Sequence, residues 1–280
     1  MGELALVVKA YIPRMHVTSL HIYPIKGCRG HAVASLDIDT LGPTGDRRLM
    51  LVDTKGRFIS QRESPRLATI TPTLDGAWLN ATAPALGPLR HDLATDGTIC
   101  AVTIWKSVGL QVVDQGDNAA AWFSSAIGQP CRLVRFGAMT HRPIDPTYSP
   151  RSEAETTFTD GYPVLGVTEA SLEDLNSQLV TPVPMSRFRP NVVVGGATPW
   201  GEDTWRAVAI GEVTLDAVKP CARCLVLTTD QESGDRDPSQ EPLRTLARIH
   251  SSPRFGATFG QNLVPRGPGV IHVGDPVRPT

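Results

Sequence analysis

The segment Lys219-Pro220-Cys221-Ala222-Arg223-Cys224 places two thiols three residues apart, with an arginine between them and a lysine upstream. It follows residues 213–215, which we predict to form a strand, and it precedes the apolar run 225–227. Positive neighbours favour the thiolate, which is the form of cysteine that attacks or binds metal. We therefore expect a small electropositive site at the end of a strand, with at least one of the two cysteines ionised.

The cysteine pair by itself fits three interpretations: a redox dithiol, a metal site and a structurally buried pair. A complete zinc site would need further ligands at suitable spacing, such as a second Cys-x-x-Cys. The other three cysteines, Cys28, Cys100 and Cys131, stand singly in the sequence. The pair alone leaves the redox, metal and structural interpretations open.

Composition argues against several classes of protein. A formal net charge of -1 gives no sign of a surface for nucleic acid. Five cysteines without regular spacing are unlike a secreted disulfide framework and fit a reducing compartment. No uncharged apolar run approaches the roughly 20 residues of a membrane span, and the run at residues 4–8 is too short for a signal peptide. We therefore expect a soluble cytoplasmic protein that binds neither nucleic acid nor membrane.

The abundance of turn-forming residues indicates the fold class. The chain has 25 glycines and 24 prolines but only 6% aromatic residues, which suits many short strands joined by tight turns. A length of 280 residues allows one large domain or two ordinary ones. The polar stretch 140–157 has three prolines and no periodicity, so it is either a boundary or a flexible loop. We predict an α+β fold, predominantly β, with two β-rich domains at residues 1–139 and 140–280 and a few helices in the second.

In the first half, apolar runs between turns predict strands at residues 17–22, 34–39, 47–52, 57–60, 99–105 and 131–136. A helix is predicted with Asp117 as its N-cap and Gly128 just past its end. The turn that carries Lys26 and Arg29 contains two glycines and is a candidate anion cradle, although a solvated turn gives the same pattern.

In the second half, strands are predicted at residues 164–167, 192–196, 259–263 and 269–277, and a hairpin at 205–215. Helices are predicted after Thr168, as N-cap, and from Pro242. The loop 200–205 carries two tryptophans and two acids, and we expect either a pocket wall or an exposed turn there.

Six short motifs occur in one order along the chain. They are Tyr23-Pro24-Ile25-Lys26, Gly45-Asp46-Arg47-Arg48, Phe188-Arg189-Pro190-Asn191, Cys221-Ala222-Arg223-Cys224, Phe259-Gly260-Gln261-Asn262 and Val273-Gly274-Asp275-Pro276. The ordered set resembles molybdenum-cofactor sulfurase C-terminal (MOSC) domain proteins that carry an N-terminal β-barrel domain, with the amidoxime-reducing components and their bacterial counterparts nearest by motif. The resemblance spans roughly residues 15–278.

The resemblance implies a molybdenum–molybdopterin cofactor (Moco), in which pterin dithiolene sulfurs and one protein cysteine hold the metal. Matching motif to motif, that cysteine is Cys224, and a soft thiolate is a suitable ligand for such a metal. Arginine forks and backbone amides suit both the phosphate and the ring of the pterin. By position, the implied phosphate and pterin contacts fall on Lys26, Gly27, Arg47, Arg189, Asn191, Ala222 and Arg223.

Two places depart from the pattern of the family's eukaryotic members. Gly27 and Ala222 stand where those proteins carry serine, so only backbone contacts are implied at these positions. Gly161-Tyr162 replaces a small hydroxylated pair, and we expect this change to reshape or gate the pocket.

The resemblance implies an oxidoreductase that reduces N-hydroxylated compounds, such as amidoximes, hydroxylamines and N-hydroxylated bases, by oxygen-atom abstraction at a Cys-ligated molybdenum centre. Two alternatives remain: a sulfur carrier with a persulfide on Cys224, and a non-catalytic module that binds or stores the cofactor. The sequence has no four grouped cysteines for an iron–sulfur cluster. We therefore expect electrons to come from a separate ferredoxin-, flavodoxin- or cytochrome-type protein served by an NAD(P)H reductase. The resemblance also implies a β-barrel in each of the two domains and a monomeric protein.

Overall fold

The computed structural model describes residues 14–149 and 151–280, so the apolar run at residues 4–8 lies outside the described part. Most of the regular structure is β, with a few short helices, and the predicted α+β, predominantly β fold class is confirmed. Among the described residues, no helix is both long enough and apolar enough to cross a membrane.

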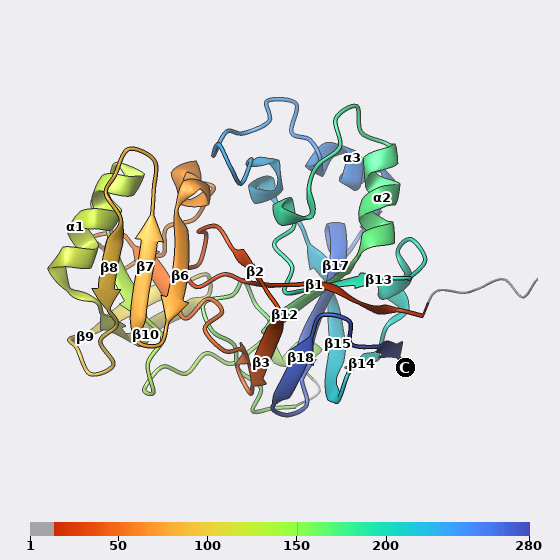
Figure 1. Ribbon diagram of the computed structural model, residues 1–280, viewed down its shortest axis with the longest axis horizontal. Coiled ribbons are helices and arrows are strands. Elements are labelled where there is room, and N and C mark those ends of the chain that lie inside the picture. Colours follow the sequence, from red (N-terminus) through yellow and green to blue (C-terminus); the bar gives the residue numbers. More distant parts are fainter. Residues whose placement is uncertain (1–13, 150) are drawn as a thin grey trace, which may run out of the picture.

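A nine-stranded sheet forms the larger part of the molecule (Figure 1). Its strands run in the order β19-β14-β15-β17-β12-β13-β1-β2, with β16 paired to β17. Only the β12–β13 pair is parallel. The strands are β1 (His16–Ile22), β2 (His31–Val33), β12 (Val164–Thr168), β13 (Val192–Gly195), β14 (Ala207–Ile210), β15 (Val213–Ala222), β16 (Ser251–Ser252), β17 (Gly256–Pro265) and β19 (Val277–Pro279).

Three smaller sheets complete the fold, in the orders β5-β11-β10-β9, β18-β3-β4 and β6-β7-β8. Their strands are β3 (Ser35–Asp39), β4 (Gly42–Pro43), β5 (Leu49–Val52), β6 (Thr71–Asp75), β7 (Trp78–Thr82), β8 (Leu89–Asp92), β9 (Ile99–Ile104), β10 (Ser107–Asp114), β11 (Arg132–Arg135) and β18 (Gly269–His272). The α-helices are α1 (Gly116–Ile127), α2 (Glu169–Ser177) and α3 (Leu243–Ile249). The short 3-10 helices are η1 (Pro65–Thr69), η2 (Pro146–Tyr148), η3 (Met185–Arg187), η4 (Gly201–Thr204) and η5 (Leu225–Thr228).

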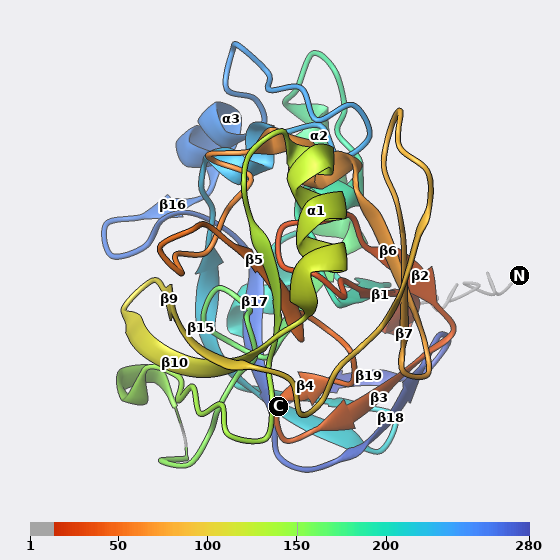
Figure 2. The same ribbon diagram turned by 90° about the vertical axis from the view of Figure 1, so that its left-hand side faces the viewer.

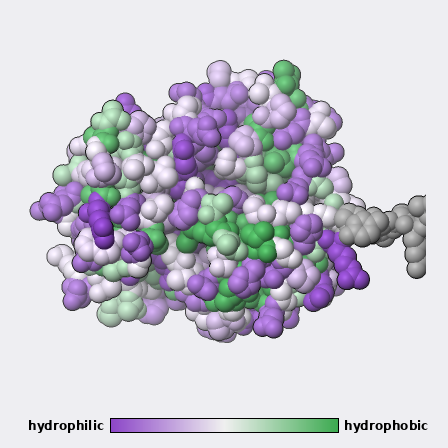
Figure 3. Space-filling model, in the orientation of Figure 1, coloured by the Kyte–Doolittle hydropathy of each residue, from purple (hydrophilic) through white to green (hydrophobic). Residues whose placement is uncertain are grey.

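The two ends of the chain interleave in space. Strand β1 pairs with β13, and β3 pairs with β18, so early strands are built into sheets with late ones. Figure 1 shows α1 beside the smaller strands, on the side of the molecule away from α2 and α3, and Figure 2 looks onto α1 from that side. On the face in Figure 3, apolar residues gather over β1 and over β3 and β18, where Val270 is 42% exposed.

The division of the chain into two domains between residues 139 and 140 stays a prediction.

Separate apolar clusters fill the spaces between these layers. Under α1, Ala119, Phe123 and Ile127 pack against strands β5 and β11, as their helical spacing predicts. Between α2, α3 and the large sheet, the ring of Phe188 stacks on that of Phe259 at 3.9 Å. Aromatic pairs of this kind contribute beyond the area they bury. Phe188 belongs to the segment just before β13, so this second cluster packs against that segment.

Several local predictions are confirmed and others are wrong. Thr168 caps α2, because its hydroxyl accepts from the backbone N–H of Ser171. Asp117 is not an N-cap: the N–H of Gly116 is taken by the carboxylate of Asp114, so α1 begins earlier and Asp117 binds Arg132 instead. The strand predicted from residue 47 begins at residue 49, since a φ of +47° at Arg47 is incompatible with a strand. Residues 57–60 make only isolated bridges.

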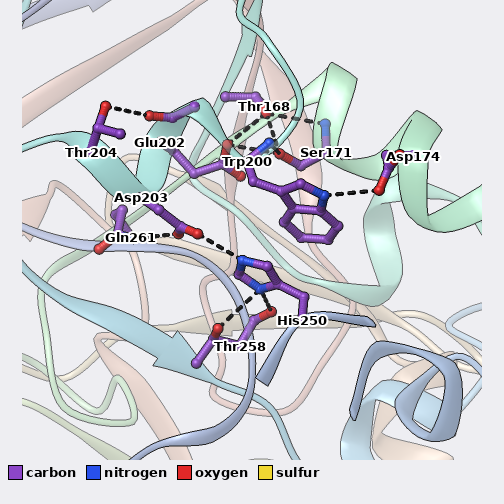
Figure 4. Close-up of polar contacts among 11 residues, drawn as sticks. Thr168, Ser171, Asp174, Trp200, Glu202, Asp203, Thr204, His250, Thr258 and Gln261 are labelled. Atoms are coloured by element: carbon purple, nitrogen blue, oxygen red, sulfur yellow. Dashed lines mark hydrogen bonds and ion pairs between the residues drawn. The ribbon is translucent and has the colours of Figure 1, made fainter. Parts of the chain in front are cut away.

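The loop at residues 200–205 is neither a pocket wall nor an exposed turn (Figure 4). Glu202 is fully buried, where its carboxylate accepts from the hydroxyls of Thr168 and Ser171, and burial raises its pKa. Trp200 stacks on His250 at 3.9 Å. The loop therefore ties α2 to α3 rather than contributing to a cavity.

His250 is the titratable part of this cluster. Its ring pairs with the carboxylate of Asp203 at 2.7 Å, and that hydrogen bond raises the pKa of His250 above its ordinary value of 6.5 despite the opposing effect of burial. A raised pKa in the folded state contributes stability that is complete below pH 6.5 and is lost as the pH rises through the folded value.

We therefore expect the unfolding free energy of the wild type to exceed that of His250→Gln by an amount that shrinks between pH 6 and pH 9. Urea denaturation across this range measures the difference. In an Asp203→Asn background the pH dependence should largely disappear, because the partner charge is gone. A difference that grows with pH would contradict this account.

Candidate functional site

A cavity of about 290 Å³ lies where the turn after β1, the segment before β13 and the end of β15 meet. The structure brings every residue that the family resemblance implies to its wall: Lys26, Gly27, Arg47, Arg189, Asn191, Ala222, Arg223 and Cys224. Arg29, the other basic residue of the candidate anion cradle, does not line this cavity and donates to the Ala68 and Glu232 carbonyls. Cys221 lines it as well. These residues come from segments nearly 200 positions apart, so the strand pairing brings them together.

The strand registers explain this convergence. Pairing of β1 with β13 places His21 beside Asn191, and the N–H of His21 donates to the Asn191 carbonyl at 2.9 Å. Just beyond β1, the N–H of Lys26 donates to the Leu49 carbonyl at 2.8 Å. Strand β15 pairs with β17 as far as Ala222, which fixes the entry into the cysteine segment.

Two arginines at the cavity pack against one tyrosine. The guanidinium carbons of Arg47 and Arg189 lie 4.1 and 4.4 Å from the ring centre of Tyr23. Both arginines adopt positive φ, +47° and +56°, which is uncommon for residues other than glycine. Burial raises the pKa of Tyr23 to about 12, so its hydroxyl stays a donor to the Pro190 carbonyl. The backbone strain of a positive φ at residues other than glycine persists where the surroundings enforce it, often at binding sites.

The two arginines differ in how many of their N–H donors find hydrogen-bond partners within the protein. Arg47 donates to the side chains of Asp46 and Asn191 and to the Arg189 carbonyl. Arg189 donates from Nη1 to Gln231, but its buried Nη2 has no hydrogen-bond partner among the described residues. Burial and the neighbouring Arg47 lower the pKa of Arg189 to about 10, well above neutrality. A buried, charged donor without a partner is costly, and an anion at this position would relieve the cost.

A reciprocal pair of amides supports Arg189, and the sequence analysis missed it. Gln61 Nε2 donates to Gln231 Oε1 at 3.0 Å, and Gln231 Nε2 donates back to Gln61 Oε1 at 3.1 Å. Gln61 also donates to the Gly27 carbonyl at 2.6 Å. Both amides are buried, so they join Arg189 and the Gly27 turn into one hydrogen-bonded unit.

Lys26 and Asp160 form an ion pair at the other side of the cavity, with 2.5 Å between Nζ and Oδ1. Lys26 is buried, whereas 79% of the Asp160 side chain is exposed, and Asp160 lines the cavity. The positive charges of Lys26, Arg47 and Arg223 hold the pKa of the Asp160 carboxyl below its ordinary value. Burial lowers the pKa of Lys26, and Asp160 opposes the change. Asp160 is therefore an ionised carboxylate in a cationic cavity, and it too was missed from sequence.

The two cysteines have different surroundings. Arg223 Nη1 donates to Cys221 Sγ at 3.1 Å, and Nη2 donates to the Phe188 carbonyl at 2.6 Å. Cys224 lies immediately before η5, and both cysteines are partly exposed and outside any disulfide. Within residues 14–149 and 151–280, no group of three or more His, Cys, Asp or Glu side chains is placed to hold a metal ion.

Comparison with known proteins agrees with this architecture. Residues 14–130 match the MOSC N-terminal beta barrel domain, and residues 153–278 match the MOSC domain. The chain is 35% identical to mitochondrial amidoxime-reducing component 1 of Mus musculus, and 34% identical to that of Homo sapiens. Each alignment covers 93% of this chain and more than 80% of the relative. The chain belongs to the MOSC-domain family.

A further MOSC relative is the molybdenum cofactor sulfurase of Oryza sativa, 31% identical over 83% of this chain but only 30% of that protein. Both MOSC-matched regions contribute to the cavity, because Lys26, Gly27 and Arg47 lie in the first and Arg189 to Cys224 lie in the second. The cavity therefore depends on both regions being present.

A buried arginine between the two matched regions fixes the segment that carries Asp160. Arg142 is 4% exposed, and Nη1 donates to the carbonyls of Thr157 and Thr159 at 2.5 and 2.8 Å. Its pKa is lowered by burial to about 10, so it stays charged at neutral pH. Part of the stretch 140–157 is thus packed into the structure.

Arg142→Met should lower the unfolding free energy by about 2–4 kcal/mol, because two buried carbonyls lose their donor. Chemical denaturation measures the loss. Arg90→Met, at an exposed position, is the control and should change stability by less than about 0.5 kcal/mol. A loss for Arg142→Met as small as that of the control would show that water replaces the guanidinium without cost.

Proposed function

We propose that this protein is a molybdenum-cofactor-dependent reductase of N-hydroxylated compounds, with Cys224 as the protein ligand of the metal. The observation that carries the proposal is the convergence of the eight sequence-predicted residues on one cationic cavity. The relatives of this chain named above, amidoxime-reducing components and a molybdenum cofactor sulfurase, support both the cofactor and the reaction.

The residues at the cavity fit an anionic pterin cofactor. Lys26, Arg47, Arg189 and Arg223 supply positive charge, and Arg189 Nη2 is a buried donor in need of an acceptor. Gly27 lines the cavity with a φ of +83°, which glycine adopts at least cost, and a Cβ there would lie 3.1 Å from Leu67 and be crowded against it. These residues, with Asn191 and Ala222, would hold the phosphate and the pterin.

The cofactor, when bound, supplies the two-electron chemistry that removes oxygen from nitrogen. Reduction of an N–OH group to N–H consumes two electrons and two protons and releases one water. Cys224 would complete the metal's ligands with a thiolate. Asp160, ionised and open to the cavity, would accept hydrogen bonds from substrate N–H groups, with Lys26 holding its carboxylate in place.

We further propose that the electrons come from a separate donor protein of ferredoxin, flavodoxin or cytochrome type, served by an NAD(P)H reductase. No four cysteines of this chain are grouped for an iron–sulfur cluster. Such donors bind transiently through modest, partly polar surfaces, so charge on the cavity rim would affect the encounter rate.

A second candidate is sulfur transfer from a persulfide on Cys224. It is favoured by the relative named molybdenum cofactor sulfurase and by the partial exposure of the thiol. Metal analysis of protein from a host that makes the cofactor separates the candidates. Stoichiometric molybdenum with turnover supports the reductase, labile sulfane sulfur without molybdenum supports transfer, and bound pterin without turnover supports a storage module.

Cys224→Ala should abolish amidoxime reduction, whereas Cys221→Ala should retain it, because a single thiolate completes the metal site. Turnover is measured with benzamidoxime and reduced viologen as electron donor, which bypasses the natural donor protein. Equal loss in the two variants would instead indicate a dithiol redox pair.

Lys26→Ala and Arg189→Ala should each lower the bound molybdopterin, since each removes a charge-assisted contact of about 1.5–3 kcal/mol. Molybdenum and pterin per protein chain are measured after purification. Arg278→Ala, which removes an arginine in β19 away from the cavity, is the matched control. Full occupancy in the Lys26→Ala, Arg189→Ala double variant would place the phosphate site elsewhere.

A further inference from the structure

Two aromatic side chains, Phe58 and Trp105, form one wall of the cavity; we call them the aromatic wall. Their ring centres lie 4.7 Å apart with the planes tilted by 56°. Phe58 follows the turn after β5 and is fixed by a hydrogen bond from its N–H to the Thr103 carbonyl. Trp105 lies at the tip of the hairpin between β9 and β10. Both belong to the region that matches the N-terminal domain of the family.

The aromatic wall stands beside the Lys26–Asp160 pair. Lys26 Nζ lies 5.5 Å from the centre of the Phe58 ring and 5.9 Å from that of Trp105, and 2.5 Å from Asp160 Oδ1. One ammonium group therefore separates an apolar surface from an ionised carboxylate. A ligand bound here meets both, with its polar end at Asp160 and its apolar end at the rings.

The two-residue turn at Trp105 and Lys106 requires a positive φ at its first position, but it does not require a tryptophan there. A tryptophan at positive φ, here +52°, is a costly choice for a turn in which glycine or asparagine is common. Its side chain is 38% exposed, and the guanidinium of Arg62 lies 4.5 Å from the ring centre. A strained backbone that presents a large ring to a cavity is typical of a ligand clamp.

Resting on the proposed reductase function, we infer that the aromatic wall selects the non-reacting part of the substrate. It binds an aryl or similarly flat apolar group attached to the carbon that bears the N-hydroxylated nitrogen. Asp160 accepts hydrogen bonds from the N–H groups at the other end of the substrate. The protein should therefore prefer aryl amidoximes to small alkyl ones. Aromatic contacts of this kind contribute enough for a preference of about five- to tenfold.

The chain contains a matched control for Trp105. Trp78 is 37% exposed and has the guanidinium of Arg90 at 4.5 Å from its ring centre, as Trp105 has that of Arg62. Trp78 lies in β7 and does not line the cavity. Replacing either tryptophan thus removes a similar surface ring and a similar cation–π contact, and only one replacement alters the cavity.

The kinetic test compares kcat/KM for benzamidoxime with kcat/KM for acetamidoxime in the cofactor-loaded protein. Trp105→Ala should lower the ratio of the two about five- to tenfold, and Trp105→Phe should restore most of it. Trp78→Ala should leave the ratio unchanged. The inference is overturned if Trp105→Ala leaves the ratio of the two kcat/KM values at its wild-type level. It is also overturned if Trp78→Ala lowers that ratio as much as Trp105→Ala does.

A binding test separates this inference from the proposed function. Benzamide and acetamide are neutral, flat and not reducible at nitrogen, so calorimetric titration with each reports binding without turnover. The wild type should bind benzamide more tightly, and Trp105→Ala should remove most of that preference. If benzamidoxime is never reduced but the wild type prefers benzamide and Trp105→Ala loses that preference, the reductase proposal fails and the inferred role of the aromatic wall is supported. If the wild type shows no preference for benzamide over acetamide, the inferred role of the aromatic wall is wrong.

Discussion

Repulsion among buried cations is the constraint on which the site depends. Arg47 and Arg189 are close enough to share the ring of Tyr23, and each would destabilise the other without compensation. The fold offsets this repulsion in three ways: the ring of Tyr23 packs against both guanidinium groups, the Asp46 carboxylate binds Arg47, and the Gln231 amide binds Arg189. Compensation is incomplete at Arg189, where one buried donor has no partner within the described part of the chain. The remaining positive charge is what makes the cavity suitable for an anion.

Strand pairing determines where those charges lie. The register of β1 on β13 positions the turn of Lys26, and the register of β15 on β17 positions Cys224. The Lys26–Asp160 pair and the aromatic wall then divide the cavity into an ionic and an apolar part. Two different sheets, the nine-stranded one that contains β1 and the four-stranded one that contains β9 and β10, therefore supply two unlike surfaces at one opening.

The sequence predicted the strands and the motif residues better than it predicted their supports. Thr168 and the 205–215 hairpin follow from local capping and turn rules, which act over a few residues. Asp160, Gln61 and Trp105 gave no such signal, because their partners lie far away in the chain. The assignment of Asp117 as a cap was wrong, because Asp114, two residues before the helix, accepts from the Gly116 N–H at the start of α1. Side-chain contacts between distant segments are what local patterns cannot supply.

The place of β1 also bears on how the chain assembles. A fragment that starts after the first region would leave the edge of β13 with unpaired N–H and C=O groups beside four buried residues, Val192, Val193, Val194 and Gly195. An apolar edge of that kind invites strand exchange, in which the β1 of one copy fills the gap in another. Until β1 has docked, the newly made chain is therefore exposed to aggregation, and early closure of this one strand protects it.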